Sequence, residues 1–222
     1  MFTMEQIRKA YIISDTHFGH LKCLNKERSE KFKTIEEHDE YIIEAINKIV
    51  KPDDLLFHLG DTGDLEKVKQ LNGIKILVKG NHDKQASKLY NSVFKEVYNY
   101  PIFISKRILL SHLPEAVSPH VLNIHGHLHG SYLDSKNHIN ASIHVIDYKP
   151  IFMRNVFSYI DKNLEPQQVK FLTEWYADKQ VFLNKEREDL VLDENGKIKL
   201  KETIELNKDL KGREECNYGK HE

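Results

Sequence analysis

Cysteine is scarce in this chain of 222 residues, and no long apolar run is present. The two cysteines, Cys23 and Cys216, lie far apart, which excludes a disulfide framework and favours a reduced, cytoplasmic protein. No apolar segment approaches the roughly 20 residues that a membrane-spanning helix needs. The N-terminal residues also lack the apolar centre of a secretory signal. The sequence therefore predicts a protein without a membrane partner.

An excess of charge of either sign is also absent. Lysine and arginine together number 33, aspartate and glutamate number 34, and the formal net charge is -1. Binding of long nucleic acids usually requires a basic surface, so nucleic acid is not supported by charge as a partner. A local basic stretch does occur at Lys22, Lys26, Arg28 and Lys31. We interpret it as a solvated loop, with a rim that steers phosphate as the alternative.

Histidine, in contrast, is abundant, and most of it falls in or beside five short clusters. In chain order the clusters are Asp15-Thr16-His17, Gly60-Asp61, Gly80-Asn81-His82-Asp83, Ser111-His112 and Gly126-His127-Leu128-His129. Each follows a short apolar run that is typical of a buried strand. Such an order brings carboxylate, imidazole and amide donors to one edge of a sheet. Donors of this kind suit two divalent transition metals, whose natural chemistry is phosphate-ester hydrolysis.

The pattern between the clusters predicts an α/β half followed by a β-rich half. Apolar runs at residues 10–14, 54–59 and 74–78 alternate with helical patterns, which indicates parallel strands joined by right-handed crossovers. The expected helices cover residues 34–49 and 64–71. Further strands are predicted at residues 102–104, 107–111, 121–124 and 143–146. Two sheets packed face to face and flanked by helices would accommodate both halves.

Beyond residue 150 the pattern changes to helices and mixed charge. Residues 153–162 and 166–183 have apolar side chains at helical spacing, and residues 190–200 read as a hairpin with an Asn-Gly turn. We therefore expect a catalytic domain at residues 1–152 and a C-terminal extension at residues 153–222. The extension could form a homo-oligomer through its apolar helix face, pack on the catalytic domain or cover the site.

The five clusters, taken together, resemble the calcineurin-like metallophosphoesterase superfamily, and within it the small bacterial and phage phosphoesterases. The resemblance covers residues 10–152 and implies an α/β fold, a four-layer α/β/β/α sandwich. The implied ligands are Asp15, His17 and His129 for a first metal ion, Asn81, His112 and His127 for a second, and Asp61 as the bridge. The implied cofactors are two divalent transition metal ions, with manganese favoured and iron, zinc, nickel or cobalt as alternatives.

The resemblance also implies roles for residues that do not bind metal. His82 matches the family's histidine near the leaving group. Asp83 follows it and could orient its ring. His20 could contact the substrate or form a local hydrogen bond. His58 and His125 sit at strand ends and are interpreted as packing or supporting residues.

These observations predict an enzyme that hydrolyses phosphate esters by in-line attack of a metal-bridging hydroxide. A compact domain without large insertions leaves room for two substituents on phosphorus, which favours a phosphodiesterase acting on a small molecule or nucleotide. A phosphomonoesterase or nucleotide pyrophosphohydrolase is the alternative. A nuclease would need a groove, and the net charge of -1 does not support one. A non-enzymatic scaffold is a further alternative, although scaffolds tend to lose the ligand set that is intact here.

Overall fold

The computed structural model describes residues 2–24, 28, 30–131, 133–164, 190–192 and 198–200. The chain divides into two compact units, Met1–Pro166 and Gln167–Glu222. In the second unit, β10 (Leu190–Leu192) pairs antiparallel with β11 (Ile198–Leu200), so the predicted hairpin is confirmed. The helix expected at residues 166–183 lies outside the described residues. None of the helices in the described ranges has the length and apolar character that a bilayer crossing requires.

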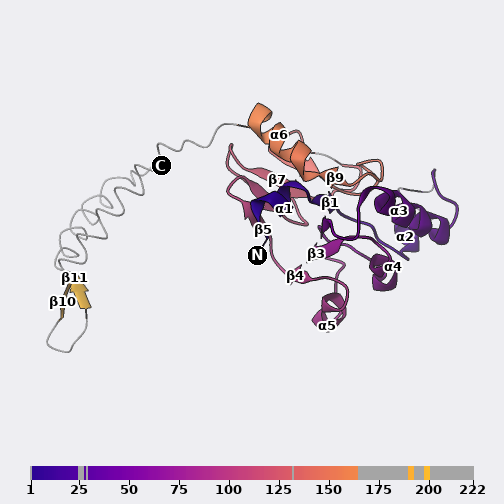
Figure 1. Cartoon of the computed structure of the whole chain (residues 1–222), viewed down its shortest axis with the longest axis horizontal. Helices are drawn as coiled ribbons and strands as arrows, with labels where there is room; N and C mark the ends of the chain where they lie inside the picture. Colours follow the sequence, from indigo (N-terminus) through magenta and orange to yellow (C-terminus); the bar gives the residue numbers. More distant parts are fainter. Residues whose placement is uncertain are drawn as a thin grey trace, which may run out of the picture. The chain divides into compact units, whose positions relative to one another are not determined.

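The first sheet holds the three strands predicted in the first half of the chain and two further strands, β4 (Glu96–Tyr98) and β9 (Ile151–Phe152), that were not predicted (Figure 1). In spatial order the strands are β4, β3 (Ile74–Val78), β2 (Leu55–His58), β1 (Tyr11–Ile13) and β9. β1 to β4 are parallel, and β9 is antiparallel to β1. Ile13 pairs with His58, and His58 pairs with Leu77. The carboxyl ends of β1, β2 and β3 therefore lie in one row, and the loops that follow them carry the first three clusters.

The second sheet is also mixed. In spatial order its strands are β5 (Ile102–Ser105), β6 (Ile108–Leu110), β7 (Leu122–His125) and β8 (His138–Asn140). β5 and β6 form an antiparallel hairpin, whereas β6, β7 and β8 are parallel. The clusters at Ser111 and Gly126 follow β6 and β7 directly, so this sheet also presents its histidines at a carboxyl edge. Two mixed sheets in an α/β fold agree with the predicted fold class.

Two hydrophobic cores separate the layers of the first unit. One lies between the sheets, where inward-facing residues such as Phe57 and Ile124 pack with α1 (Met4–Arg8) and α6 (Met153–Asn163). The other lies on the opposite face of the first sheet. It is covered by α3 (Ile35–Ile49), α4 (Leu65–Lys69) and α5 (Ser87–Asn91).

On the outer face of the second sheet, loop backbone meets polar side chains of β7 and β8. The Glu115 backbone nitrogen donates to Asn123 Oδ1 at 2.8 Å, and His138 Nε2 lies 2.9 Å from the Glu115 oxygen. The outward positions of β7 and β8 are polar, and loop backbone groups can satisfy them.

Helix α6 lies in the first compact unit, beyond the domain boundary expected at residue 152. Met153, Val156 and Ile160 are at most 2% exposed and lie in the core between the sheets. Their spacing places all three on one side of the helix. The first unit accordingly extends to Pro166.

Residues 143–146 form a turn, not the predicted strand. The backbone nitrogens of Val145 and Ile146 both donate to the Ser142 oxygen, at 2.9 and 3.3 Å. Asp147 and Tyr148 then take left-handed φ values of 50° and 57°. Ile143 is buried in the core beneath α3 and Ile146 packs against it, whereas Val145 is exposed.

Helix α3 begins where the sequence predicts. Thr34 Oγ1 accepts a hydrogen bond from the Glu37 backbone nitrogen at 3.1 Å, which caps the helix. The helix ends at Ile49, ahead of Pro52. Its first turns carry two buried polar residues, His38 and Asp39, toward the loop after β1.

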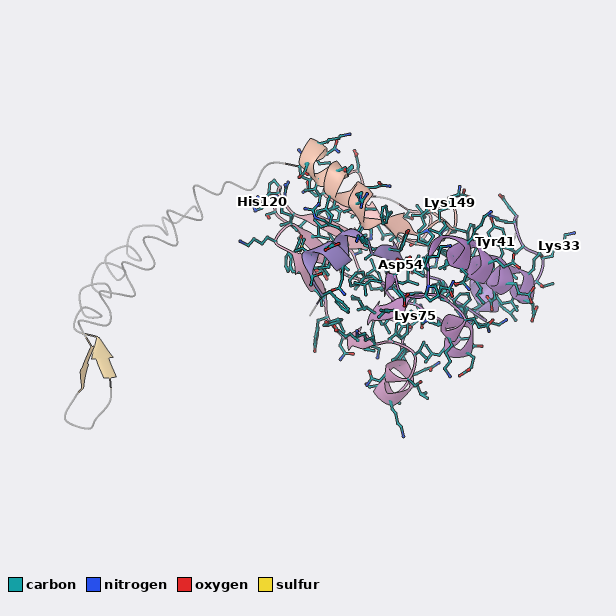
Figure 2. All side chains as sticks on the ribbon, in the orientation of Figure 1. Lys33, Tyr41, Asp54, Lys75, His120 and Lys149 are labelled. Atoms are coloured by element: carbon teal, nitrogen blue, oxygen red, sulfur yellow. The ribbon has the colours of Figure 1, made fainter. Side chains whose placement is uncertain are left out.

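A short helix, α2 (Leu21–Cys23), follows that loop. Figure 2 shows the side chains of the described residues, with Tyr41 of α3 and Lys149 on the same flank of the first unit.

Candidate metal centre

The five clusters converge at the carboxyl edges of the two sheets and form two groups of donor atoms. The first group is Asp15, His17 and His129, and the second is Asp61, His112 and His127. Within each group the donor atoms lie within 4.8 Å of one another. All six residues belong to the ligand set that the sequence predicts, and their roles as ligands stay predictions.

The first group joins the loop after β1 to the loop after β7. His17 Nε2 lies 3.2 Å from His129 Nε2, which lies 3.6 Å from Asp15 Oδ1. The Asp15 carboxylate accepts hydrogen bonds from Ser142 Oγ at 2.9 Å and from the His127 backbone nitrogen at 3.0 Å. Two ring nitrogens and a fixed carboxylate oxygen therefore face one point.

Asn81 completes the second group, and Asp61 lies between the two. Asn81 Oδ1 is 2.9 Å from His112 Nε2 and 3.0 Å from His127 Nδ1. Asp61 Oδ2 is 3.6 Å from His17 Nε2 and 3.4 Å from His112 Nε2. A carboxylate in this place could share its oxygens between two ions.

This donor set fits a cation. His112 Nδ1 donates to the Leu59 oxygen at 2.8 Å, so Nε2 of the neutral ring carries a lone pair. That lone pair faces the side-chain oxygens of Asn81 and Asp61, which are acceptors as well. Two ligands on one ion, each with a bond of about 2.1 Å, lie about 3 Å apart. Lone pairs that converge at this spacing need a proton or a metal ion between them.

Burial and charge set the protonation of the donors. Burial raises the pKa of Asp61, but hydrogen bonding to His112 and its charge outweigh this and lower the pKa to about 2. Burial lowers the pKa of His17 to about 3 and also lowers that of His127. These two rings are therefore neutral at pH 7, in the form that binds metal. For His112, burial lowers the pKa, but the hydrogen bond to Asp61 and the nearby carboxylate charges raise it overall.

We expect metal affinity to fall between pH 7 and pH 5, with the second group affected first. Because the pKa of His112 is raised, a proton occupies this ring in the metal-free protein as the pH falls, and a metal ion has to displace it. His17, with a pKa of about 3, does not compete in this range. Calorimetric titration with Mn²⁺ at both pH values would measure affinity and proton release. Equal occupancy at the two pH values would contradict the assignment.

The backbone at five of the seven donor residues is left-handed, a conformation that most residues with a side chain avoid. The φ angle is 56° at Asp15, 48° at His17, 54° at Asp61, 66° at His127 and 48° at His129. Each such residue costs about 1–3 kcal/mol, and strain of this kind concentrates at functional sites. The strained backbone therefore orients these side chains toward one another and lowers the stability of the fold.

Asp83 ties the second and third clusters together. Its Oδ2 accepts from the backbone nitrogens of Asp61 and Gly80, both at 2.8 Å, and its Oδ1 accepts from the Thr62 nitrogen at 3.0 Å. Asp83 thus supports the loops that carry Asp61 and Asn81. This differs from the role in orienting the His82 ring that the resemblance implied.

His58 ties the first and second clusters together. The Gly60 nitrogen donates to His58 Nδ1 at 3.2 Å, so Nε2 carries the proton and donates to Thr16 Oγ1 at 2.9 Å. Thr16 Oγ1 in turn donates to the Thr62 oxygen at 2.8 Å. Burial lowers the pKa of His58 to about 4, which keeps this neutral tautomer at pH 7.

His82 and His20 stand beside the first group. His82 is exposed, and its backbone nitrogen donates to Asp61 Oδ1 at 2.9 Å. Its ring centre lies 5.7 Å from that of His17 and 6.2 Å from that of His20, and the His20 and His17 ring centres are 5.6 Å apart. His20 Nδ1 also lies 3.2 Å from Cys23 Sγ. Both histidine rings therefore lie beside the ring of His17.

The sequence interpretation missed the contributions of Ser142 and Arg28. Ser142 follows β8, a strand that was not predicted, and nothing in its neighbourhood marks it as a partner of Asp15. Arg28 was assigned to a solvated basic stretch, but it is 1% exposed and donates to the backbone behind the first group. Its charge alone gave no sign of burial.

Comparisons with known proteins agree with this geometry. The family model described as calcineurin-like phosphoesterase matches residues 8–203. The chain belongs to the calcineurin-like phosphoesterase family. An uncharacterized protein of Methanocaldococcus jannaschii is 31% identical over an alignment of 176 residues, and the match covers 70% of this chain and 93% of that protein.

Two crystal structures are similar to this family member. A protein of unknown function from Aquifex aeolicus has a TM-score of 0.55 and 30% sequence identity, covering 67% of this chain and 97% of its own. Nuclease MPE from Pseudomonas putida has a TM-score of 0.39 and 21% identity, covering 55% of this chain and 62% of its own. The second likeness is too low to bear on the activity.

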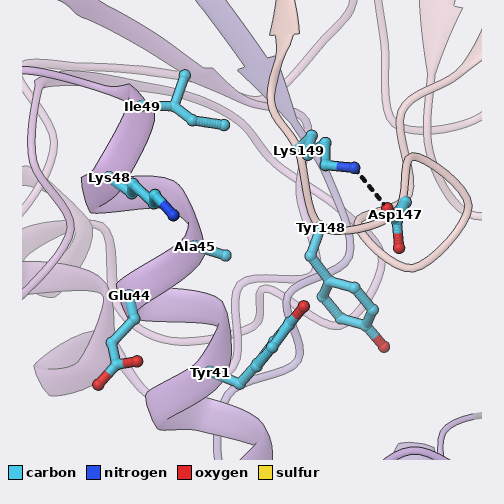
Figure 3. Close-up of a pocket in the computed structure, with 8 residues that line it drawn as sticks. All are labelled: Tyr41, Glu44, Ala45, Lys48, Ile49, Asp147, Tyr148 and Lys149. Carbon is cyan, nitrogen blue, oxygen red and sulfur yellow. Dashed lines mark hydrogen bonds and ion pairs between the residues drawn. The ribbon is translucent and has the colours of Figure 1, made fainter.

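A cavity of about 540 Å³ lies between α3 and the turn at Asp147, and none of the donor residues lines it (Figure 3). Tyr41 and Tyr148 line it, and Asp147 pairs with Lys149 at its rim at 2.7 Å. The donor groups themselves lie at the sheet edges, where Asn81 and His82 are exposed.

Proposed function

We propose that this calcineurin-like phosphoesterase hydrolyses phosphate esters with two divalent metal ions, and that phosphodiesters are its preferred substrates. The convergence of seven nitrogen and oxygen donor residues at the sheet edges carries the proposal. Asp15, His17 and His129 would hold one ion and Asn81, His112 and His127 the other, with Asp61 between them. When bound, such ions supply an activated water and neutralise charge on the phosphoryl oxygens. The nitrogen and oxygen donors accept manganese, iron, zinc, nickel or cobalt, and we favour manganese.

His82 would donate a proton to the leaving oxygen. Its exposure, its ring beside that of His17 and its backbone hydrogen bond to Asp61 Oδ1 support this role. His20 lies close enough to His82 to contact the same substituent. A positioned imidazole typically contributes about 10²–10⁴-fold to such a step.

The side chains beside the first group support a diester substrate. His20 and His82 are imidazoles, whereas the second negative charge of a monoester is usually met by arginine or lysine. Arg28 points into the protein and does not serve this purpose. The exposed site also leaves room for two substituents, as in a small phosphodiester or a nucleotide. Self-association through the C-terminal extension is proposed as well.

We expect His82→Ala to lower turnover of a chromogenic phosphodiester about a hundredfold or more in the presence of Mn²⁺. The matching monoester, assayed in parallel, tests the alternative of a phosphomonoesterase or pyrophosphohydrolase. The control is His120→Ala, since His120 is partly exposed, bonds to Ser118 and is labelled in Figure 2. Absence of turnover of either ester by the wild type, with two ions bound, would favour a scaffold.

A further inference from the structure

Arg28 is a charged residue whose side chain is almost completely buried behind the first donor group. It is 1% exposed, and its guanidinium reaches the backbone of the loop that carries Asp15 and His17. Nη2 donates to the Asp15 oxygen at 2.6 Å, and Nη1 donates to the Thr16 oxygen at 3.0 Å. A buried cation is costly unless it is paired, so the partners on its other side matter.

Those partners form a chain that returns to the same loop. Arg28 Nη1 donates to His38 Nε2 at 2.6 Å, so the neutral His38 ring carries its proton on Nδ1. Nδ1 donates to Asp39 Oδ1 at 2.8 Å. Asp39 Oδ2 accepts from the Gly19 backbone nitrogen at 2.9 Å. Arg28 and Asp39 carry opposite charges, and His38 is hydrogen-bonded to both.

We propose that Arg28, His38 and Asp39 act as a positioning unit for the first metal ion. The unit holds the loop of residues 15–19 at both ends. Arg28 donates to the backbone oxygens at the start of the loop, and Asp39 accepts from the backbone nitrogen of Gly19 at its end. Between these points Asp15 and His17 keep left-handed φ angles of 56° and 48°. An isolated loop would relax out of this conformation, and its donors would then separate. The inference rests on the metal centre proposed above.

The arrangement assigns the unit to the first ion in particular. Asp61 and the loop of Asn81 are held by Asp83, and His112 is held by the Leu59 oxygen. None of those contacts involves Arg28, His38 or Asp39. Loss of the unit should therefore lower the affinity for the first ion and leave that for the second unchanged, whereas a general loss of stability would lower both affinities.

The test is titration of the metal-free protein with Mn²⁺, followed by calorimetry and electron paramagnetic resonance. The wild type is expected to bind two ions and give the signal of a coupled pair. Arg28→Met removes the donors and keeps a long side chain. We expect it to bind one ion with the wild-type affinity of the second group, to bind the other at least tenfold more weakly, and to give a mononuclear signal at one equivalent.

Lys31→Met is the matched control, because it removes the same charge from the same segment. Lys31 Nζ donates to the Tyr41 hydroxyl at 3.0 Å and lies 4.0 Å from the Tyr148 ring centre, beside the cavity of Figure 3. It should bind both ions normally. If Arg28→Met does not fold, Asp39→Asn replaces it, since this change keeps the side-chain shape and removes the charge that Arg28 balances.

Unchanged affinity for both ions in a folded Arg28→Met or Asp39→Asn variant would overturn the inference and leave the proposed function intact. An equal loss of both ions would also overturn it, because the effect would not be confined to the first group. A wild type that binds no Mn²⁺ would overturn the proposed function and, with it, this inference.

Discussion

Replacement of Asp61 by asparagine is expected to remove both metal ions and to lower ester turnover about a thousandfold or more. Asp61 Oδ2 lies 3.6 Å from a nitrogen of the first group and 3.4 Å from one of the second, so both sites lose the same charge. The pKa of about 2 means that this carboxylate is ionised at neutral pH. Asparagine keeps the shape but offers one neutral oxygen. A loss of about 4 kcal/mol in transition-state stabilisation corresponds to about a thousandfold in rate.

Metal content and turnover of the purified variant would be measured together. Asp147→Asn is the matched control: Asp147 is exposed, it pairs with Lys149, and asparagine tolerates its left-handed φ of 50°. The control should retain two ions and full turnover. An Asp61→Asn protein that still held two ions would show that this residue does not bridge the groups.

Gly60→Ala is expected to destabilise the protein by about 3 kcal/mol or more, because two separate strains coincide there. The φ angle of Gly60 is +95°, a region that L-residues rarely adopt. An added Cβ would also lie 2.4 Å from the Gly80 nitrogen and 2.8 Å from His112 Nδ1. Neither the backbone of the third cluster nor a ring fixed by Leu59 can move without disturbing the donors.

Thermal unfolding of the metal-free variant would measure this effect. A change of about 3 kcal/mol corresponds to a decrease in Tm of about 6–12 °C in a domain of this size. The control is Gly130→Ala, where an added Cβ meets no atom within 4 Å. A Gly60→Ala protein with the Tm of the control would mean that an added Cβ at Gly60 does not meet the backbone of Gly80.

The central strands of the first sheet, β1, β2 and β3, were predictable because they are largely buried, whereas β4 and β9 are only partly buried and were not predicted. β2 is buried at all four positions, so its sequence reads as an uninterrupted apolar run. β8 was missed for the opposite reason: two of its three residues, His138 and Asn140, are polar and satisfied by nearby backbone. Burial that arises from side-chain hydrogen bonds leaves no apolar pattern to detect.

The donor residues were predictable by type and order, but their support was not. A ligand set needs particular side chains, and these appear in the sequence. The unit of Arg28, His38 and Asp39 depends on where α3 packs, and Arg28 looks in the sequence like any basic residue of its stretch. The left-handed φ angles at Asp15 and His17 were equally unpredictable, because neither residue type is specific to that conformation.

The shortness of β9 has a consequence for how copies of this protein meet. Only Phe152 and Ile151 pair with β1, and α6 begins at the next residue. A strand of this length offers an incoming chain almost no ladder to join, which is one way in which proteins prevent edge-to-edge aggregation. A shortened chain that ended before Ile151 would lack β9 and would leave β1 as an unpaired edge strand. A shortened catalytic domain must therefore keep β9, which protects this edge, as well as the donor residues.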